Sequence, residues 1–519
     1  MIASARRLGR PNVAAVALPI ALAFACAGCD DGPGEPTAVA RPPAEAPAVD
    51  AVLGGSTEPA ADPTLIAAGP PIALSVRAMN PVRRPDLAAA DLRPGRWSPD
   101  GGALVAWQVV DRAATVLAGR AWLVAAPADD GTGQAPLPSP VWDSGDIEGP
   151  LEPGLEHLAV WLADGTLAVA RSDEMLITAD GLPGPPVAGL GERQLRGLLP
   201  APDGTRLLAY GPAGAWIVAA DGRAEAVAES AAASSARAAE GLGAWTWRPD
   251  GGALAAAGGA EILVADLLTG GPLAIVARVD AVGGDPVADA ASTPEGSADQ
   301  PAMPRWLADG TLFLGGPSPL AGGRPDYLYR AIHADGTIAF ALPEQLGRDP
   351  SPVPVAGASA WVAPDGRAIL YPEVVAGPDG PAVRASWLYD VATGQARALP
   401  PMVDAVWSPD GGRVAWSEAG AVLVRDLDSD RVAVLASAGA AGSARFAWSP
   451  DGRWLLFGGA LGDLWLARAD ATAGTVRVAE DVAWEPLGPT WSPSSDRFAL
   501  AVRGPDGGTR FIVAELPAE

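Results

Sequence analysis

The sequence contains no lysine, two cysteines and two histidines among its 519 residues. All 36 basic residues are therefore arginines, and 61 acidic residues leave a formal net charge of −25. This charge argues against a nucleic-acid partner, because binding to a phosphate backbone needs clustered basic side chains. A phosphate loop of the Gly-x-x-x-x-Gly-Lys type is excluded because there is no lysine.

Sequence patterns of catalytic and metal sites are also missing. His157 and His333 are far apart in sequence, so we expect no histidine-rich metal site. The Gly-x-Ser-x-Gly elbow of a serine hydrolase does not occur. Asp426 to Asp430 has acidic residues at alternate positions, as calcium loops do, but it lacks the glycine and distant glutamate of such loops. We interpret it as a hairpin turn and expect no metal, no cofactor and no enzymatic activity.

One short phrase recurs along the chain, in nine copies that are mostly about 40 to 60 residues apart, a period typical of repeat architectures. The copies are Trp-Ser-Pro-Asp-Gly at 97–101, 407–411 and 448–452, Trp-Arg-Pro-Asp-Gly at 247–251, Trp-Ser-Pro-Ser-Ser at 491–495, Trp-Leu-Ala-Asp-Gly at 161–165 and 306–310, Ala-Pro-Asp-Gly at 201–204, and Trp-Val-Ala-Pro-Asp-Gly at 361–366.

The phrase has the chemistry of a type I turn. Serine suits the first position, proline fixes φ at the second, aspartate bonds nearby backbone, and Gly101 accepts the left-handed conformation that follows. Residues 103–107 then alternate in the way of a half-buried strand. In the copy at Trp448, three further strands are predicted near 454–457, 463–467 and 475–478, which gives four short antiparallel strands per repeat.

We expect the repeat residues to be structural, because a ring or carboxylate at a fixed repeat position packs between units or closes a turn. They are Trp97, Asp100, Gly101, Trp161, Asp164, Asp203, Trp247, Asp250, Trp306, Asp309, Asp365, Trp407, Asp410, Trp448, Asp451 and Trp491.

The phrase, followed by an apolar strand and an Asp-Leu turn such as Asp266-Leu267 or Asp426-Leu427, resembles the TolB-type, WD-like β-propeller repeat. The resemblance covers roughly residues 94–519. It implies an all-β fold, a single β-propeller of about eight or nine four-stranded blades. It says little about function, since such repeats occur in binding proteins, assembly factors and the non-catalytic propellers of certain peptidases.

The last repeat lacks a fourth strand before the chain ends, while Pro71 to Arg77 reads as a strand without a partner. We expect this N-terminal strand to complete the last blade and close the ring, so that the propeller spans 71–519. Closure would remove an open edge that invites association.

The N-terminus reads as a lipoprotein signal peptide, residues 1–28. Arg6, Arg7 and Arg10 precede an apolar stretch at 13–25 that ends in Cys26-Ala27-Gly28-Cys29. Ala-Gly-Cys resembles the bacterial lipobox, which implies lipidation of Cys29. A plain signal peptide or a Cys-x-x-Cys redox pair are the alternatives. Residues 29–70, rich in proline and alanine, are predicted to be a disordered tether.

Three functions remain open. The favoured one is a non-catalytic, lipid-anchored propeller in the bacterial cell envelope, monomeric, that binds a protein or peptide partner in a scaffold or assembly role. The alternatives are a carbohydrate-binding lectin and a hydrolase-like enzyme with carboxylates in the central channel. The lectin would use tryptophans outside the repeat position, namely Trp122, Trp142, Trp216, Trp387, Trp465 and Trp484. Long inserts at 125–157, 224–243 and 277–304 could also carry binding.

Overall fold

The computed structural model describes residues 65–66, 75–79, 91–112, 116–125, 147–150, 158–170, 175–179, 182–190, 195–230, 233, 243–258, 261–278, 304–314, 317–319, 325–327, 329–342, 360–377, 380–436, 441–459, 462–480, 482, 488–503 and 509–516. The chain divides into two units, Met1–Ala61 and Asp62–Glu519, and all described residues belong to the second. The predicted signal peptide, Cys29 and most of the predicted tether therefore lie outside the described residues.

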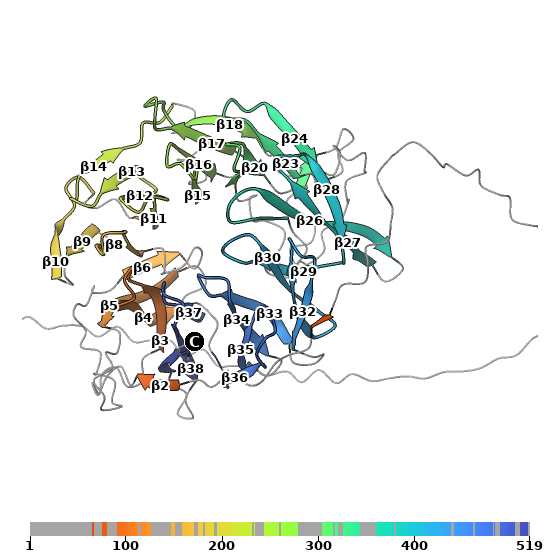
Figure 1. Cartoon of the computed structure of the whole chain (residues 1–519). Helices are drawn as coiled ribbons and strands as arrows, with labels where there is room; N and C mark the ends of the chain where they lie inside the picture. The colour runs from red at the N-terminus through yellow and green to blue at the C-terminus, as the bar shows by residue number, and fades with distance from the viewer. Residues whose placement is uncertain are drawn as a thin grey trace, which may run out of the picture. The chain divides into compact units, whose positions relative to one another are not determined.

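Antiparallel sheets make up the described part of the chain. Eight sheets have four strands, and a further one has five because β1 (Leu65–Ile66) adds to its edge. The sheets stand side by side around a ring, as the blades of a β-propeller do (Figure 1). The predicted all-β propeller of eight or nine four-stranded blades is confirmed. We number the blades 1 to 9 in chain order.

The innermost strands of blades 1 to 9 are β3 (Asp91–Trp97), β7 (Ala159–Trp161), β11 (Gly197–Pro200), β15 (Gly243–Trp247), β19 (Arg305–Trp306), β25 (Trp361–Val362), β29 (Val403–Trp407), β33 (Ala441–Trp448) and β37 (Thr490–Trp491). The second strands are β4 (Ala103–Arg112), β8 (Leu167–Ala170), β12 (Arg206–Gly211), β16 (Ala253–Gly258), β20 (Leu312–Leu314), β26 (Ala368–Gly377), β30 (Arg413–Glu418), β34 (Trp454–Gly459) and β38 (Arg497–Arg503).

The third strands are β5 (Val116–Ala125), β9 (Met175–Ala179), β13 (Gly214–Ala219), β17 (Glu261–Asp266), β23 (Tyr329–Ile332), β27 (Gly380–Asp390), β31 (Ala421–Asp426), β35 (Leu464–Arg468) and β39 (Thr509–Glu515). The outermost strands are β6 (Ile147–Pro150), β10 (Leu182–Pro186), β14 (Ala224–Ala226), β18 (Ala274–Arg278), β24 (Ile338–Leu342), β28 (Gln395–Leu399), β32 (Val432–Ala436), β36 (Val476–Ala479) and β2 (Ser75–Met79). A small separate sheet pairs β21 (Pro317–Pro319) with β22 (Pro325–Tyr327).

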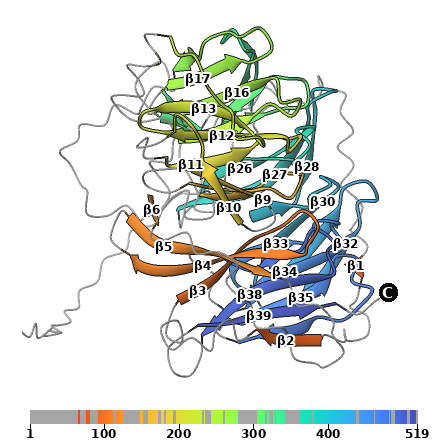
Figure 2. The ribbon, with the colours of Figure 1, turned by 90° about the vertical axis from the view of Figure 1, so that its left-hand side faces the viewer.

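An N-terminal strand closes the ring, as the sequence predicted. β2 pairs antiparallel with β39 along five residues, from Ser75 opposite Glu515 to Met79 opposite Phe511. It supplies the outer strand that blade 9 would otherwise lack (Figure 2). The strand begins four residues later than the predicted start at Pro71. Blades 1 and 9 also meet at the inner side, where β3 contacts β37.

The structure adds strands where the sequence gave no strand signal. Leu65 and Ile66, within the range predicted as tether, form β1 and pair parallel with Val432 and Ala433 of β32. β6 falls within the predicted insert 125–157, and β14 lies at the start of the insert 224–243. These short strands are fixed by pairing to a neighbouring strand, which composition does not reveal.

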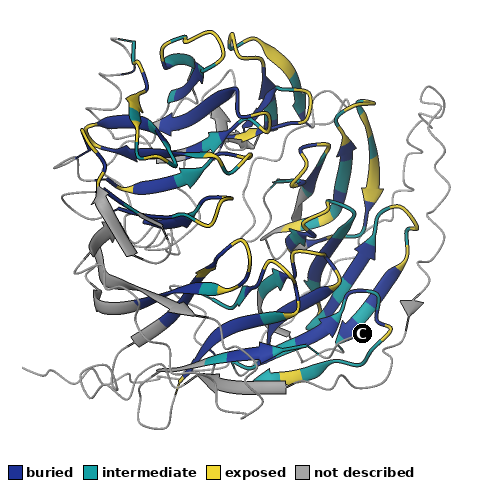
Figure 3. Cartoon of the chain, turned by 60° about the vertical axis from the view of Figure 1, so that its left-hand side comes forward, coloured by how far each residue is buried: buried dark blue, intermediate teal, exposed yellow. Residues whose placement is uncertain are grey.

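The hydrophobic core is a series of layers between neighbouring blades (Figure 3). The second strands carry most of it, because both faces of a blade are covered by a neighbour and apolar side chains can follow one another without alternation. β34 shows this, since all its residues from Trp454 to Gly459 are buried. A ring built in this way can be large because each blade needs only its two neighbours.

Candidate functional site

A tight turn leads from each innermost strand to the second strand. In blade 1 the N–H of Gly101 donates to the carbonyl oxygen of Ser98 at 2.9 Å, and Gly101 has a φ of +70°, where glycine is favoured. Oδ1 of Asp100 accepts from the N–H of Gly102 at 2.8 Å and from the Ser98 hydroxyl at 2.5 Å. The same hydroxyl oxygen accepts from the N–H of Ala103 at 2.8 Å. Serine, aspartate and glycine of the phrase are thus all used within the turn.

The aspartate of seven other turns accepts in the same way from the backbone N–H two residues later. The pairs are Thr166 to Asp164 (2.9 Å), Thr205 to Asp203 (3.0 Å), Gly252 to Asp250 (2.7 Å), Thr311 to Asp309 (2.9 Å), Arg367 to Asp365 (3.0 Å), Gly412 to Asp410 (3.0 Å) and Arg453 to Asp451 (3.0 Å). In blade 9, Ser495 takes the glycine position with a φ of +62°, and Asp496 accepts from the hydroxyls of Ser492 and Ser494.

In several of these turns the hydrogen bonds lower the pKa of the carboxyl group. The Ser98 hydroxyl and the Gly102 N–H hold the pKa of Asp100 below its usual value. Partial burial acts to raise the pKa of Asp410 and Asp451, but the serine hydroxyl and backbone N–H of each turn outweigh it, so both values are lowered. The repeat carboxylates are thus used within their own turns.

Tryptophans of the phrase join each blade to the blade before it. The indole N–H donates to the backbone carbonyl that precedes the equivalent position of the previous blade. The six pairs are Trp97 to Thr490 (3.2 Å), Trp161 to Arg96 (3.1 Å), Trp247 to Leu199 (3.1 Å), Trp407 to Trp361 (3.1 Å), Trp448 to Val406 (3.3 Å) and Trp491 to Ala447 (3.1 Å).

Blades 3, 5 and 6 depart from this pattern, and in blade 3 the tryptophan position is taken by Pro200. The buried Nε1 of Trp306 has no hydrogen-bond partner in the described part of the chain. In blade 6, Val362 stands four residues before Gly366, the place that tryptophan takes in other copies, and Trp361 is one residue too early. Because side chains alternate along a strand, that shift turns Trp361 to the opposite face, where it packs with Trp407 and the layer between blades 6 and 7.

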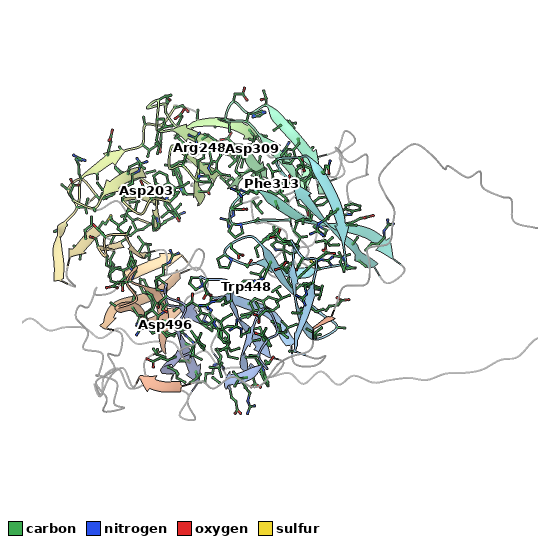
Figure 4. All side chains as sticks on the ribbon, viewed as in Figure 1. Asp203, Arg248, Asp309, Phe313, Trp448 and Asp496 are labelled. Atoms are coloured by element: carbon green, nitrogen blue, oxygen red, sulfur yellow. The ribbon has the colours of Figure 1, made fainter. Side chains whose placement is uncertain are left out.

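A second set of contacts joins the turns themselves. Nη2 of Arg206 donates to the carbonyl oxygen of Gly251 at 2.8 Å, and Nη1 of Arg413 donates to that of Gly452 at 2.9 Å. The turns of blades 3 and 4 and those of blades 7 and 8 therefore touch. We call the nine turns, which follow one another around the ring, the circle of turns. Figure 4 shows Asp203, Arg248, Asp309 and Asp496, which come from four of these turns.

The acidic segment considered as a calcium loop is occupied by arginines. Asp430 binds two guanidinium groups, with Nη2 of Arg425 at 2.6 Å and Nη1 of Arg397 at 2.7 Å. Asp426 accepts from Ser429 and lies 3.4 Å from Nε of Arg413. Among the described residues there is no group of three or more His, Cys, Asp or Glu side chains that could hold a metal ion.

The structure describes one of the two histidines. His333 is exposed and begins the turn before β24, where its carbonyl accepts from the N–H of Gly336 at 2.9 Å. His157 lies outside the described residues. No helix in the described part of the chain is long and apolar enough to cross a membrane.

Tryptophans outside the repeat position are packed wherever their side chains are described. Trp216 is 8% exposed, Trp465 packs against the layer between blades 7 and 8, and Trp387 donates its indole N–H to Oε2 of Glu373 at 2.8 Å. Trp142 and Trp484 lie outside the described residues, as does the side chain of Trp122. The described tryptophans form no exposed stacking surface for a sugar.

Two kinds of residue were not singled out from the sequence. Arg206, Arg413 and Arg497 all stand two residues after the glycine position, a spacing that could have marked them as contacts to the next blade. Asp404 gave no signal. It lies at a bulge in β29 with a φ of +53°, and burial raises its pKa, in contrast to the carboxylates of the turns.

The circle of turns, the blade-to-blade tryptophans and the N-terminal closing strand define the molecule as a β-propeller. No protein-family model matches the sequence, and no curated protein matches it either. Among solved structures, the chain is similar to the crystal structure of the eukaryotic initiation factor, with 13% sequence identity and a TM-score of 0.42. That match covers 67% of this chain and 81% of the other chain, and it carries no argument about function.

Proposed function

We propose that the protein is an envelope-anchored β-propeller that binds a protein or peptide partner and catalyses no reaction of its own. The observation that carries the proposal is how the repeat side chains are used. The carboxylates close turns and six indoles tie blades together, which gives a ring with fixed geometry. A preformed surface favours partner binding, because little conformational freedom is lost when the complex forms.

The anchoring part of the proposal comes from the sequence. An apolar segment preceded by arginines ends at Ala27-Gly28-Cys29, which resembles a lipobox, and the repeat resembles the TolB type. The lipid on Cys29 would attach the chain to a membrane, and the residues that follow would link the anchor to the ring.

The anchor is tested by the intact mass of the protein extracted from membranes of its native host, with Cys29→Ala as the control. The expected mature form begins at Cys29 and carries a lipid, while the Cys29→Ala chain is not lipidated. A mature form without lipid, starting elsewhere, would contradict the anchor and leave the binding function to be tested on a secreted propeller.

The partner is tested separately by cross-linking in the native host. Amine-reactive reagents are unsuitable because the chain has no lysine, so a photoreactive amino acid is placed at exposed Leu268. We expect one protein to be cross-linked from this site and not from a control site at exposed Arg431 on the rim of blade 7. Equal recovery of the same proteins from both sites would argue against a specific partner.

A further inference from the structure

The outer edge of each blade carries unpaired backbone groups that can pair with another strand, and most blades are protected against this. Seven outer strands contain a charged residue or proline: Glu148 in β6, Pro183 in β10, Glu225 in β14, Arg278 in β18, Arg397 in β28, Arg477 in β36 and Arg77 in β2. The two outer strands with neither are β24 and β32.

These two strands differ in how their edges are covered. β32 is paired by β1, which adds Leu65 and Ile66 in parallel to Val432 and Ala433. In the described part of the chain, β24 is the last strand of its sheet, and no strand pairs with its outer edge. The uncharged edge of β32 thus binds a short extended apolar segment of the chain. The comparable edge of β24 has no such segment in the described part of the chain.

Side chains at β24 point to an interaction surface. Ile338 is 61% exposed, which is unusual for a large apolar residue in this ring, where Leu268 of the neighbouring blade is the other described example. Ile338 lies opposite Ile332, and Ala341 lies opposite Arg330 on the adjacent strand β23. Directly opposed residues share a face of the sheet, so Arg330 and Ala341 are neighbours on one face.

Arg330 supplies the charge that such a surface would recognise. It is half-buried, and its side chain has no hydrogen bond or ion pair to another residue in the described part of the chain. Alanine is small, so an acidic side chain on a strand added beside β24 could reach Arg330 across Ala341. A bulge lies between Ile338 and Phe340, which leaves Phe340 to Leu342 as the regular part of the edge.

We propose that the outer edge of β24 binds an extended segment of a partner protein by strand addition. The segment has apolar side chains beside Ile338 and Phe340 and one acidic side chain opposite Ala341, which pairs with Arg330. This inference rests on the proposed partner-binding function and names the surface and the chemistry of the partner.

A second copy of this chain fits the same edge less well. Two copies paired through β24 would bring two unpaired Arg330 side chains toward one interface, and each copy carries a net charge of −25. A partner segment with an acidic residue meets Arg330 locally, and the general repulsion between acidic molecules is screened beyond about 8 Å at physiological salt.

The test uses the full chain and a fluorescent peptide, Ser-Ile-Val-Glu-Val-Ile-Ser with blocked ends, followed by anisotropy. One control peptide replaces Glu with Gln, and a second carries N-methyl groups on alternate backbone nitrogens, which remove strand pairing and keep the side chains. We expect the Glu peptide to bind with a dissociation constant below about 1 mM, the Gln peptide roughly two- to fivefold more weakly, and the N-methylated peptide not at all.

Variants locate the peptide on the ring. Arg330→Gln should abolish the preference for Glu over Gln, and Ile338→Ser should weaken binding roughly threefold or more. Arg431→Gln, on the rim of blade 7, should leave binding unchanged. Absence of binding, or binding unaffected by Ile338→Ser, would overturn the inference. A chain that sediments as a dimer and becomes monomeric in Ile338→Ser would overturn it in favour of a second copy.

This result can be separated from that of the proposed function. If cross-linking in the native host identifies a partner whose recovery is unchanged by Ile338→Ser and Arg330→Gln, the binding function stands and the β24 surface is wrong.

Discussion

Blades 7 to 9 differ from blades 2 and 5 at the third residue of the turn phrase. In blades 7 to 9 this position is proline, which has no N–H to offer. In blades 2 and 5 it is alanine. The N–H of Ala163 donates to the carbonyl of Gly204 at 2.9 Å, and the N–H of Ala308 donates to that of Gly366 at 3.0 Å. The looser copies of the phrase thus replace a rigid turn residue with a backbone hydrogen bond to the next blade.

This difference means that a glycine in the next turn is needed for two different reasons. In blades 2 and 5 the alanine N–H approaches the glycine carbonyl of the next turn, so the two turns lie in contact. That glycine is required because there is no space for a Cβ and because its φ is positive. Elsewhere only the backbone conformation requires glycine. The following variants separate these reasons and the joints that depend on them.

The largest effect is expected for Gly366→Ala. A Cβ there would lie 2.7 Å from the backbone nitrogen of Ala308, at a φ of +70°. Because the contact is with backbone, the two turns must move apart, and we expect a loss of about 3 kcal/mol or more in the free energy of unfolding measured in urea.

Gly165→Ala is the matched control. Its φ is +86°, but a Cβ would meet nothing within 4 Å, so only backbone strain of about 1–2 kcal/mol is expected. Equal losses for the two variants would contradict the close contact between the turns of blades 5 and 6.

Next in size is the difference between Trp448→Phe and Trp306→Phe. Phenylalanine at 448 leaves the Val406 carbonyl without the indole N–H that it accepts at 3.3 Å. At 306 the substitution removes an N–H that is buried without a partner. We expect Trp448→Phe to cost about 1–2 kcal/mol more than Trp306→Phe in the same unfolding experiment. A larger loss for Trp306→Phe would mean that its N–H is bonded in solution.

Much of this architecture could be predicted from the sequence, because it is local. The turn phrase and the alternating strand after it need only neighbouring residues, so repeat positions and sheet class follow from them. The copy at 361–366 has one residue more than the others, so its spacing already puts Val362 at the tryptophan position. The packing of Trp361 in the layer between blades 6 and 7 is seen only in the structure. β1 could not be foreseen, because two residues gain strand structure only through the edge of β32.

A smaller effect is expected for Ala308→Pro, which gives blade 5 the proline of blades 7 to 9. The hydrogen bond to the Gly366 carbonyl is lost, and the proline ring takes the place of the N–H against an oxygen that lies 3.0 Å from the nitrogen. Because the native N–H is hydrogen-bonded, we expect a loss of more than about 1 kcal/mol, seen as a lower midpoint of thermal unfolding. An unchanged midpoint would contradict the contact between the two turns.

The smallest effect per residue concerns pH. The pKa values of Asp100 and Asp451 are lower in the folded ring than their ordinary values. Their contribution to stability is present above the ordinary pKa of about 3.9 and is lost as the pH falls through the folded values, since the unfolded chain then binds protons first. We expect the midpoint of urea unfolding to fall below about pH 4, and less steeply in Asp451→Asn. An unchanged midpoint down to pH 2 would contradict the role of these carboxylates.

Closure of the ring by β2 is the central claim, and hydrogen exchange tests it most directly. The measurement compares amide protection of β39 in the full chain and in a chain lacking residues 70–79, with a deletion of residues 50–59 as the control. The account predicts that β39 is protected in the full chain and in the control and exchanges much faster when β2 is removed. Equal protection of β39 in all three chains would contradict closure by the N-terminal strand.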